Sequence, residues 1–250
     1  MFSSENIQTG AFFALVLAFE ILERARPARE VDRWKDLKID VFSFALAIAM
    51  NRCSHYTVTG LVNAYAPAWL VGGWHGLQGL PGVVRVVMAI FLVDFMIYWI
   101  HRAQHEFDLL WRTHAWHHSI EQLYWFSGFR TSFLHSFLYN VPQAALPMLV
   151  FNLSPLEAGI GYSIGLLIQF WEHTNIDVNV GPLRYLIITP AYHRVHHSTG
   201  HSRTNLGTTF SLWDRLFGTY HDPAKVPADA PLGLGEPYDK KKMARMLVGV

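Results

Sequence analysis

A long apolar run that ends in two histidines dominates the chain: Val83-Val-Arg-Val-Val-Met-Ala-Ile-Phe-Leu-Val-Asp94-Phe-Met-Ile-Tyr98-Trp-Ile-His101-Arg-Ala-Gln-His105. Up to Ile100 its only charged residues are Arg85 and Asp94, and a helix of about 20 mostly apolar residues is long enough to span a bilayer. Asp94, Tyr98, His101 and His105 recur with the period of one helix face. Because a carboxylate inside a membrane helix is costly, we expect Asp94 to orient an imidazole through its second ring nitrogen or to pair with an arginine.

Two later segments repeat a second histidine pattern, H-x-x-H-H. They are His114-Ala-Trp-His117-His118 and His193-Arg-Val-His196-His197. Residues three or four apart on a helix share a face, so each pattern directs two or three imidazoles the same way. Neutral imidazole is a ligand for iron, zinc and copper. Together with the H-x-x-x-H of His101 and His105, these groups exceed the needs of one ion and indicate a site for two metals.

The remaining histidines differ in context. His173 directly follows an apolar run, one turn after Gln169, and we predict that it is a ligand. His135 lies within an apolar run with Thr131 and Ser132 one turn before it, which favours a hydrogen-bonded interior histidine, a tenth ligand being the alternative. We expect structural or solvated roles for the other four, which are His55, His75, His201 and His221.

The composition indicates one large domain in contact with lipid. Of the 250 residues, 51% are hydrophobic and 16% are charged, whereas soluble domains average about 25% charged residues. The formal net charge of +1 gives no reason to expect nucleic acid. A single cysteine, Cys53, excludes an internal disulfide and a thiolate-rich metal site, and we expect it to be buried.

Further apolar runs predict a membrane bundle of four to five helices, an all-α fold. The runs cover residues 11–22, 41–70 and 83–100, and a hairpin formed by 132–151 and 156–171 with a turn at 152–155. The first run lacks a convincing signal-peptide pattern and spans only if it recruits residues 7–10. The oxygenase domain is expected to cover 1–222, and 223–250 to form a flexible basic tail with either a short lipid-bound helix or no order after Lys240.

The distribution of basic residues between these runs predicts how the chain is oriented in the membrane. Six arginines and lysines lie within 24–38, whereas the connection at 72–82 has none. The positive-inside rule places the first segment in the cytoplasm. The three histidine motifs and His173 then reach the cytoplasmic side, where they would form a metal-binding cap.

Several other metal chemistries do not match. Arg102 stands where the H-E-x-x-H motif of zinc proteases has its catalytic glutamate. Histidine pairs 13 residues apart, such as His101 and His114, would suit a haem-carrying electron-transfer membrane protein. That alternative from another class leaves both H-x-x-H-H groups unexplained.

The motifs together resemble the fatty acid hydroxylase/sterol desaturase superfamily over about residues 85–222. The resemblance rests on the segment from Asp94 to His105 and on four others, which are Leu110-Trp-Arg-Thr-His114-Ala-Trp-His117-His118-Ser119, Gln169-Phe-Trp-Glu-His173-Thr, Thr189-Pro-Ala-Tyr-His193-Arg-Val-His196-His197 and Trp213-Asp-Arg-Leu-Phe-Gly-Thr219. Bacterial sterol-desaturase-like and alkylglycerol monooxygenase-like members are the most similar. The chain departs from the pattern at Tyr192, where a histidine is common, and at Asn175, where the alkylglycerol type has a glutamate.

This resemblance implies an integral, multi-pass membrane enzyme that holds two iron ions and uses O2 on a C–H bond of a membrane lipid. The implied ligands are His101, His105, His114, His117, His118, His173, His193, His196 and His197. We therefore expect a hydroxylase or monooxygenase acting on a fatty acyl, alkylglycerol or sterol-like substrate, with a sterol-type desaturase as the alternative.

The expected chemistry needs support from other groups. Outer carboxylates can tune the charge of an all-imidazole site. The residues expected to support it are Asp94, Gln169, Glu172, Asn175 and Asp214. No flavin, haem or iron–sulfur motif is present, so electrons would come from an external reductase or small electron carrier. Arg130 and the aromatic residues 124–126 are expected at the lipid headgroups or as interfacial anchors.

Overall fold

The computed structural model describes residues 4–67 and 74–250, and side chains from residue 13 onward except that of His75. Gly72 and Gly73, which begin the connection predicted on the outer side, and the end of the 41–70 run lie outside the described residues. Within the described part the fold is helical, with isolated β-bridges but no strand. The helices are α1 Ser4–Ala25, α2 Arg33–Tyr65, α3 His75–Gln78, α4 Gly82–Glu106, α5 Asp108–His114, η1 His117–Ser119, η2 Ser127–Phe129, α6 Phe133–Leu149, α7 Pro155–His173, η3 Gly181–Tyr185, α8 Pro190–His196, α9 Leu212–Phe217, η4 Pro223–Lys225 and α10 Lys240–Val248.

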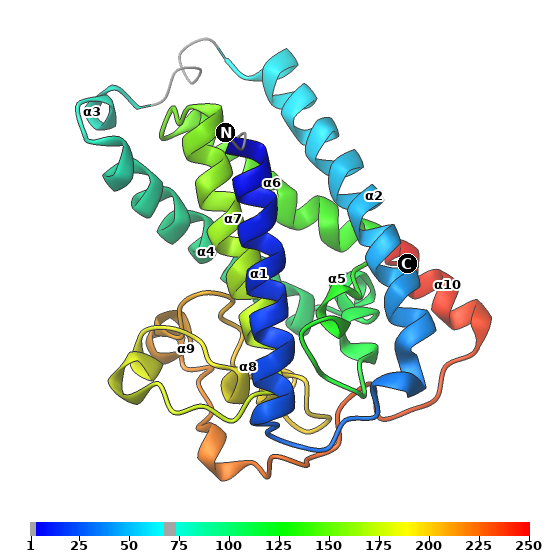
Figure 1. Cartoon of the computed structure of the whole chain (residues 1–250). Coiled ribbons are helices and arrows are strands. Elements are labelled where there is room, and N and C mark those ends of the chain that lie inside the picture. The colour runs from blue at the N-terminus through cyan, green and yellow to red at the C-terminus, as the bar shows by residue number, and fades with distance from the viewer. Residues whose placement is uncertain (1–3, 68–73) are drawn as a thin grey trace.

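The long helices α1, α2, α4, α6 and α7 stand beside one another above a cap of short helices and loops (Figure 1). Helix α4 is central, because it packs against both α6 and α7 and leads directly into α5. Among the described residues, α4 alone is both long and apolar enough to cross a bilayer by itself. The end of α4 therefore carries His101 and His105 to the cap.

The predicted hairpin is present as α6 and α7. The Ser132 hydroxyl caps α6 by accepting a hydrogen bond from the His135 N–H at 3.1 Å. Ser154 and Glu157 form a capping box at the start of α7, after a turn in which Asn152 has a φ of 46°. The hairpin thus returns the chain to the cap, where α7 ends at His173.

Helix α2 differs from its prediction. It begins at Arg33, well before the apolar run, and the Asp32 side chain caps it by accepting from the Trp34 N–H at 3.1 Å. Its buried face carries mostly small and polar residues, which are Asp40, Ser43, Ala47, Ser54 and Val58. The apolar run alone does not reveal this polar start, because Asp36 and Asp40 point inward, the reverse of a soluble amphipathic helix.

Polar contacts join α2 to α6. The Asn140 amide donates to the Ser54 hydroxyl at 2.6 Å and to the Asn51 side-chain oxygen at 3.2 Å. Hydrogen bonds of this kind between small-residue faces hold helices together in lipid. The two helices therefore present their larger apolar side chains outward.

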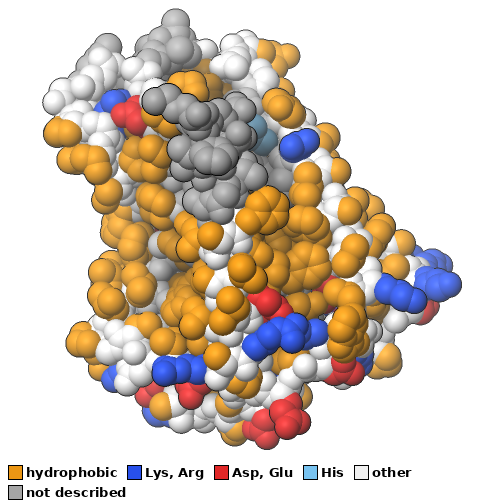
Figure 2. Space-filling view, in the orientation of Figure 1, with side chains coloured by type: hydrophobic (Ala, Val, Ile, Leu, Met, Phe, Trp, Pro, Cys, Tyr) orange, Lys and Arg blue, Asp and Glu red, His pale blue; other side chains and the backbone are white. Residues whose placement is uncertain are grey.

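The outer surface of the long helices is apolar. Phe42 and Tyr56 of α2 are 50% and 74% exposed, and Val87 of α4 is 60% exposed. Hydrophobic side chains cover much of the middle of the face in Figure 2, with charged side chains mainly toward the cap. Cys53 belongs to this outer surface, so the prediction that it is buried is wrong. It points away from the polar inner face of α2.

The C-terminal segment ends in the short basic helix predicted near Lys240. Helix α10 packs against α5, and its Met246 is buried with Trp116 and Ala115. This part of the segment is therefore docked on the cap through an apolar contact, in contrast to the flexible tail expected there.

Candidate metal centre

All nine histidines predicted as ligands meet in the cap. Their ring nitrogens form two groups, and within each group the candidate ligand atoms lie within 4.8 Å of one another. The first group has five members, His101, His105, His114, His118 and His196, and the second has four, His117, His173, His193 and His197. All nine side chains are buried. Each H-x-x-H-H motif contributes to both groups. His117 and His118 belong to different groups, and so do His196 and His197.

The two groups lie side by side. The rings of His118 and His197 stack with centroids 4.6 Å apart, and those of His114 and His117 stack at 4.9 Å. Each of these pairs joins one member of each group. The arrangement is therefore one continuous cluster with two centres.

Backbone carbonyls fix the protonation of four rings. A carbonyl oxygen only accepts hydrogen bonds, so the facing ring nitrogen must carry the proton. The four bonds run from Nδ1 of His101 to Leu206 O (2.7 Å), of His117 to Arg130 O (3.1 Å), of His173 to Gln169 O (2.8 Å) and of His196 to Thr204 O (2.9 Å). The Nε2 atoms of these neutral rings are left with a lone pair directed into the cluster.

One result is a pair of lone pairs that face each other in the group of four. Nε2 of His117 and Nε2 of His173 are 3.2 Å apart, and neither carries a proton when both Nδ1 atoms donate. Two such lone pairs repel unless a cation lies between them. The donor set of this group therefore fits a metal ion.

The group of five has a similar contact. His101 Nε2 carries no proton, because Nδ1 of that ring donates to the Leu206 carbonyl, and it faces His114 Nε2 at 3.0 Å. His114 Nδ1 lies 3.0 Å from His135 Nδ1, and when it donates there its Nε2 atom presents a second lone pair to His101. His105 Nε2 is buried in the same group without a hydrogen-bond partner. A second metal ion fits here.

Burial keeps the cap histidines neutral. It lowers the pKa of His114, His117 and His118 well below the ordinary value of histidine, and lowers the pKa of His193, His196 and His197 in the same way. Neighbouring imidazoles add to the effect because a second positive charge would be repelled. The neutral ring is the form that binds metals.

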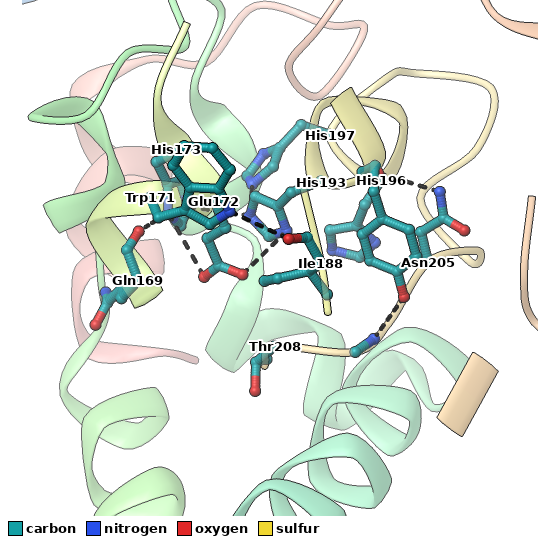
Figure 3. A network of polar contacts seen from close by, with 12 residues as sticks. Gln169, Trp171, Glu172, His173, Ile188, His193, His196, His197, Asn205 and Thr208 are labelled. Carbon is teal, nitrogen blue, oxygen red and sulfur yellow. Dashed lines mark hydrogen bonds and ion pairs between the residues drawn. The ribbon is translucent and has the colours of Figure 1, made fainter. Parts of the chain in front are cut away.

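Glu172 lies beside the group of four, as Figure 3 shows. Its two carboxylate oxygens are each 3.6 Å from a ring nitrogen, Nδ1 of His173 on one side and Nδ1 of His193 on the other. This buried carboxyl group lies where it would offset positive charge once the imidazoles hold a cation. Gln169 contributes through its backbone carbonyl, which fixes the His173 ring.

Asp94 does not orient an imidazole, and it has no arginine partner, so both expectations for it need correction. Its carboxylate accepts from the Thr208 hydroxyl and the Trp213 indole, both at 2.8 Å, and from the Phe210 N–H at 3.2 Å. It ties α4 to the segment that follows Leu206. Because the Leu206 carbonyl accepts from His101, Asp94 supports the cluster only at a distance.

Asp214 organises the same segment from α9. Its fully buried carboxylate accepts from the N–H groups of Leu206 (2.7 Å) and Gly207 (2.8 Å) and from the Tyr192 hydroxyl. Tyr192, in the place where the superfamily often has a histidine, thus holds α8 to α9 and does not enter either group. Asp214 acts by positioning the carbonyl that fixes His101.

Two further expectations are corrected. Asn175 binds the backbone of Arg29, donating to its carbonyl at 2.8 Å and accepting from its N–H at 3.2 Å, so it anchors the link after α1. Arg130 is fully buried and does not face headgroups, because it pairs with Asp40 at 2.7 Å and with Asp36 at 3.0 Å. Tyr124 is also buried and donates to Asp40 at 2.8 Å.

Gly128 is a residue that sequence reasoning missed. A Cβ atom at this position would lie 2.6 Å from Cγ of His173, which is closer than side chains approach. The glycine leaves room for the ring. No local pattern signals this, because His173 is on another helix.

A cavity of about 200 Å³ opens next to the histidines, between α4, α6 and α7. His101, His114, His117, His173 and His193 line its inner end. The rest of its wall is largely apolar. An extended hydrocarbon chain could therefore approach both groups.

The part of the chain that forms this cluster, residues 86–219, matches the fatty acid hydroxylase family. The chain belongs to this family. The match includes all nine clustered histidines and the supporting Asp94 and Asp214. The family's members are oxidoreductases that act on lipids, among them the relatives described next.

Three relatives illustrate the range of the family. Alkylglycerol monooxygenase of Xenopus tropicalis is 37% identical over 133 residues, 51% of this chain and 28% of the relative. Ornithine lipid hydroxylase OlsE of Rhizobium tropici is 31% identical over 66% of this chain and 50% of its own length. Human lathosterol oxidase is 29% identical over 60% of this chain and 49% of its own. The chain thus spans half or less of these relatives, and a comparison with solved structures found no match.

Proposed function

We propose that this protein is an O2-dependent hydroxylase or monooxygenase that holds two iron ions and oxidises a C–H bond of a membrane lipid. The observation that carries the proposal is the close contact of two Nε2 atoms in each histidine group, His117 with His173 at 3.2 Å and His101 with His114 at 3.0 Å. Each pair accounts for one cation. Imidazole ligands suit several metals, and iron is favoured because the relatives carry out oxygenation of lipids.

The iron ions would supply the redox chemistry that activates O2. The residues of this chain would do the rest. Nine imidazoles would hold the ions, Glu172 would offset their charge, and the apolar cavity would keep water from the reacting carbon. Electrons would come from an external reductase or small carrier reaching the cap.

The inverted polarity of α2 supports a multi-pass arrangement in the membrane. Buried Asp40 and Ser43 oppose exposed Val41 and Phe42, so the outward face of this helix suits lipid. We propose that all five long helices lie in the bilayer. The basic residues between α1 and α2 would then place the cap in the cytoplasm.

The substrate class is proposed from the relatives. Their names describe an alkylglycerol, an ornithine lipid and a sterol. Incubation of membranes containing this protein with a lipid panel under labelled O2 tests the class. We expect one lipid to gain labelled oxygen. A product that gains a double bond without label would instead identify a desaturase.

Metal analysis tests the site. Purified protein should contain about two irons per chain, and both His117→Ala and His196→Ala should lose metal and activity together. Full activity in either variant would contradict the ligand assignment. A Soret band in the visible spectrum would contradict the di-iron proposal in favour of a haem protein.

A further inference from the structure

The cavity runs along three helices away from the histidines. On α4 its wall extends from His101 to Val86, fifteen residues, or roughly 22 Å at the helical rise per residue. On α6 the wall extends from His135 to Pro147, and on α7 from His173 to Ala158. Such a length fits one extended hydrocarbon chain.

Two glycines of α7 lie in this wall. A Cβ at Gly161 would be 3.8 Å from side-chain atoms of both Val86 and Ile90, so at this depth the two helices already approach van der Waals contact. A Cβ at Gly165 would meet nothing within 4 Å. The cavity is therefore narrow at Gly161 and open at Gly165.

The exposure of the wall shows where the cavity opens. Most of its apolar wall is buried or half-buried, but Tyr162, Gly165 and Gln169 are exposed although they line it. These three residues follow at helical spacing on one face of α7. The opening is therefore lateral, along the side of α7.

At its inner end the cavity reaches a buried polar group. The Glu172 side chain lines the cavity, is 5% exposed, and its Oε2 atom has no hydrogen-bond partner. The nearby histidines of both groups line the same end. A chain that enters from the side of α7 would therefore reach the metal-binding groups.

We infer that Gly165 marks a lateral entrance through which one hydrocarbon chain of a bilayer lipid passes to the histidine groups. This inference rests on the proposed lipid oxidation. The occupant is a lipid chain because most of the α4 wall is apolar (Val86, Ala89, Ile90, Val93 and Ile97), the opening lies on a helix proposed to lie in the bilayer, and the passage is continuous with the histidines.

A photoreactive lipid tests the entrance without relying on turnover. The probes are a long-chain alkylglycerol and a long-chain fatty acid, each with a diazirine at the end of its chain, added to protein in phosphatidylcholine vesicles. In the wild type we expect light-induced labelling of residues that line the cavity. Gly165→Trp should reduce it about tenfold or more, because the indole ring would occupy the opening and exclude the chain.

Gly159→Trp is the matched control. Gly159 is an exposed glycine of the same helix, an added Cβ there meets nothing within 4 Å, and it does not line the cavity. Labelling and iron content should stay at the wild-type level. Equal labelling of the Gly165→Trp and Gly159→Trp variants would overturn the entrance.

A second variant tests the entrance in protein that has already folded, so that misfolding cannot explain a loss of labelling. In a Cys53→Ala background, Gly165→Cys protein is folded and purified first and then alkylated with a bulky maleimide in detergent, beside Gly159→Cys. Alkylation at residue 165 should block labelling, whereas alkylation at 159 should not. Unchanged labelling after alkylation at 165 would again overturn the entrance.

If the wild type is labelled at the cavity but oxidises no lipid, the proposed function fails and the entrance stands, so the two failures are distinct.

Discussion

His117 donates a hydrogen bond from Nδ1 to the backbone carbonyl of Arg130, 3.1 Å away, while the guanidinium of Arg130 is fully buried and paired with Asp40 at 2.7 Å. The first contact fixes the tautomer of a candidate ligand. The second holds that carbonyl in place from α2, a helix that contributes no ligand. The position of the group of four thus depends on an ion pair between residues 90 apart in sequence.

Asp40→Asn should therefore destabilise the protein and disturb the metal centre. Breaking a buried ion pair on one side costs up to about 3–5 kcal/mol, and the Asp36 carboxylate, which also pairs with Arg130, should reduce this cost. We expect a lower thermal unfolding temperature in detergent and fewer irons per chain. Lys35→Met is the control, since the Lys35–Glu121 pair is half exposed and such pairs contribute at most about 1 kcal/mol. Similar unfolding temperatures for the two variants would contradict the role of the buried pair.

Gly128→Ala should affect one histidine group and spare the other. The added methyl would lie 2.6 Å from Cγ of His173, so that the ring must move. We expect iron to fall from about two to about one per chain, measured by elemental analysis, with the remaining ion in the group of five. Gly200→Ala, where an added Cβ meets nothing within 4 Å, should keep both ions. Retention of both ions in Gly128→Ala would show that the ring can be accommodated elsewhere.

Asp214→Ala should unfold the protein more easily and weaken the group of five. The N–H groups of Leu206 and Gly207 would lose their buried acceptor, and each unsatisfied group costs about 1–3 kcal/mol. The Leu206 carbonyl would then no longer fix His101. Thermal unfolding and iron affinity measure both effects. Glu236→Ala, which removes an exposed carboxylate paired with Lys242, should change neither, and an equal loss in both variants would refute the positioning role.

Local spacing was enough to predict the parts of the site that lie on one element. Helix α4 carries Asp94, His101 and His105 on one buried face, as their period requires. The α6–α7 hairpin follows from its apolar runs and turn. The gathering of the nine histidines at one end also follows from the order of these runs.

The remaining features depend on contacts between distant segments. Arg130 was expected at the headgroups, but its partners Asp36 and Asp40 lie 90 or more residues earlier in the chain. The polar start of α2 lies outside the apolar run that predicted this helix. Asp94 likewise bonds Thr208 and Trp213, more than a hundred residues away. No local period can predict such pairings, since they arise only when the helices pack.

The last prediction concerns His135, which contacts the group of five either as the partner that orients His114 or as a tenth ligand. Its Nδ1 atom lies 3.0 Å from His114 Nδ1, where it can accept a hydrogen bond from that ring as the carbonyls do from other rings. His135→Gln retains an acceptor and should keep both irons. His135→Leu removes it and should weaken iron binding by about 10–100-fold, the usual effect of losing a partner of a ligating histidine.

Iron titration of the purified variants measures this difference. His118→Ala is the comparison, because it removes a member of the group itself and should abolish one binding event outright. If His135→Gln instead behaves like His118→Ala, His135 is a tenth ligand. The graded order, with His135→Gln near the wild type, His135→Leu weaker and His118→Ala lacking one ion, identifies His135 as the residue that orients His114.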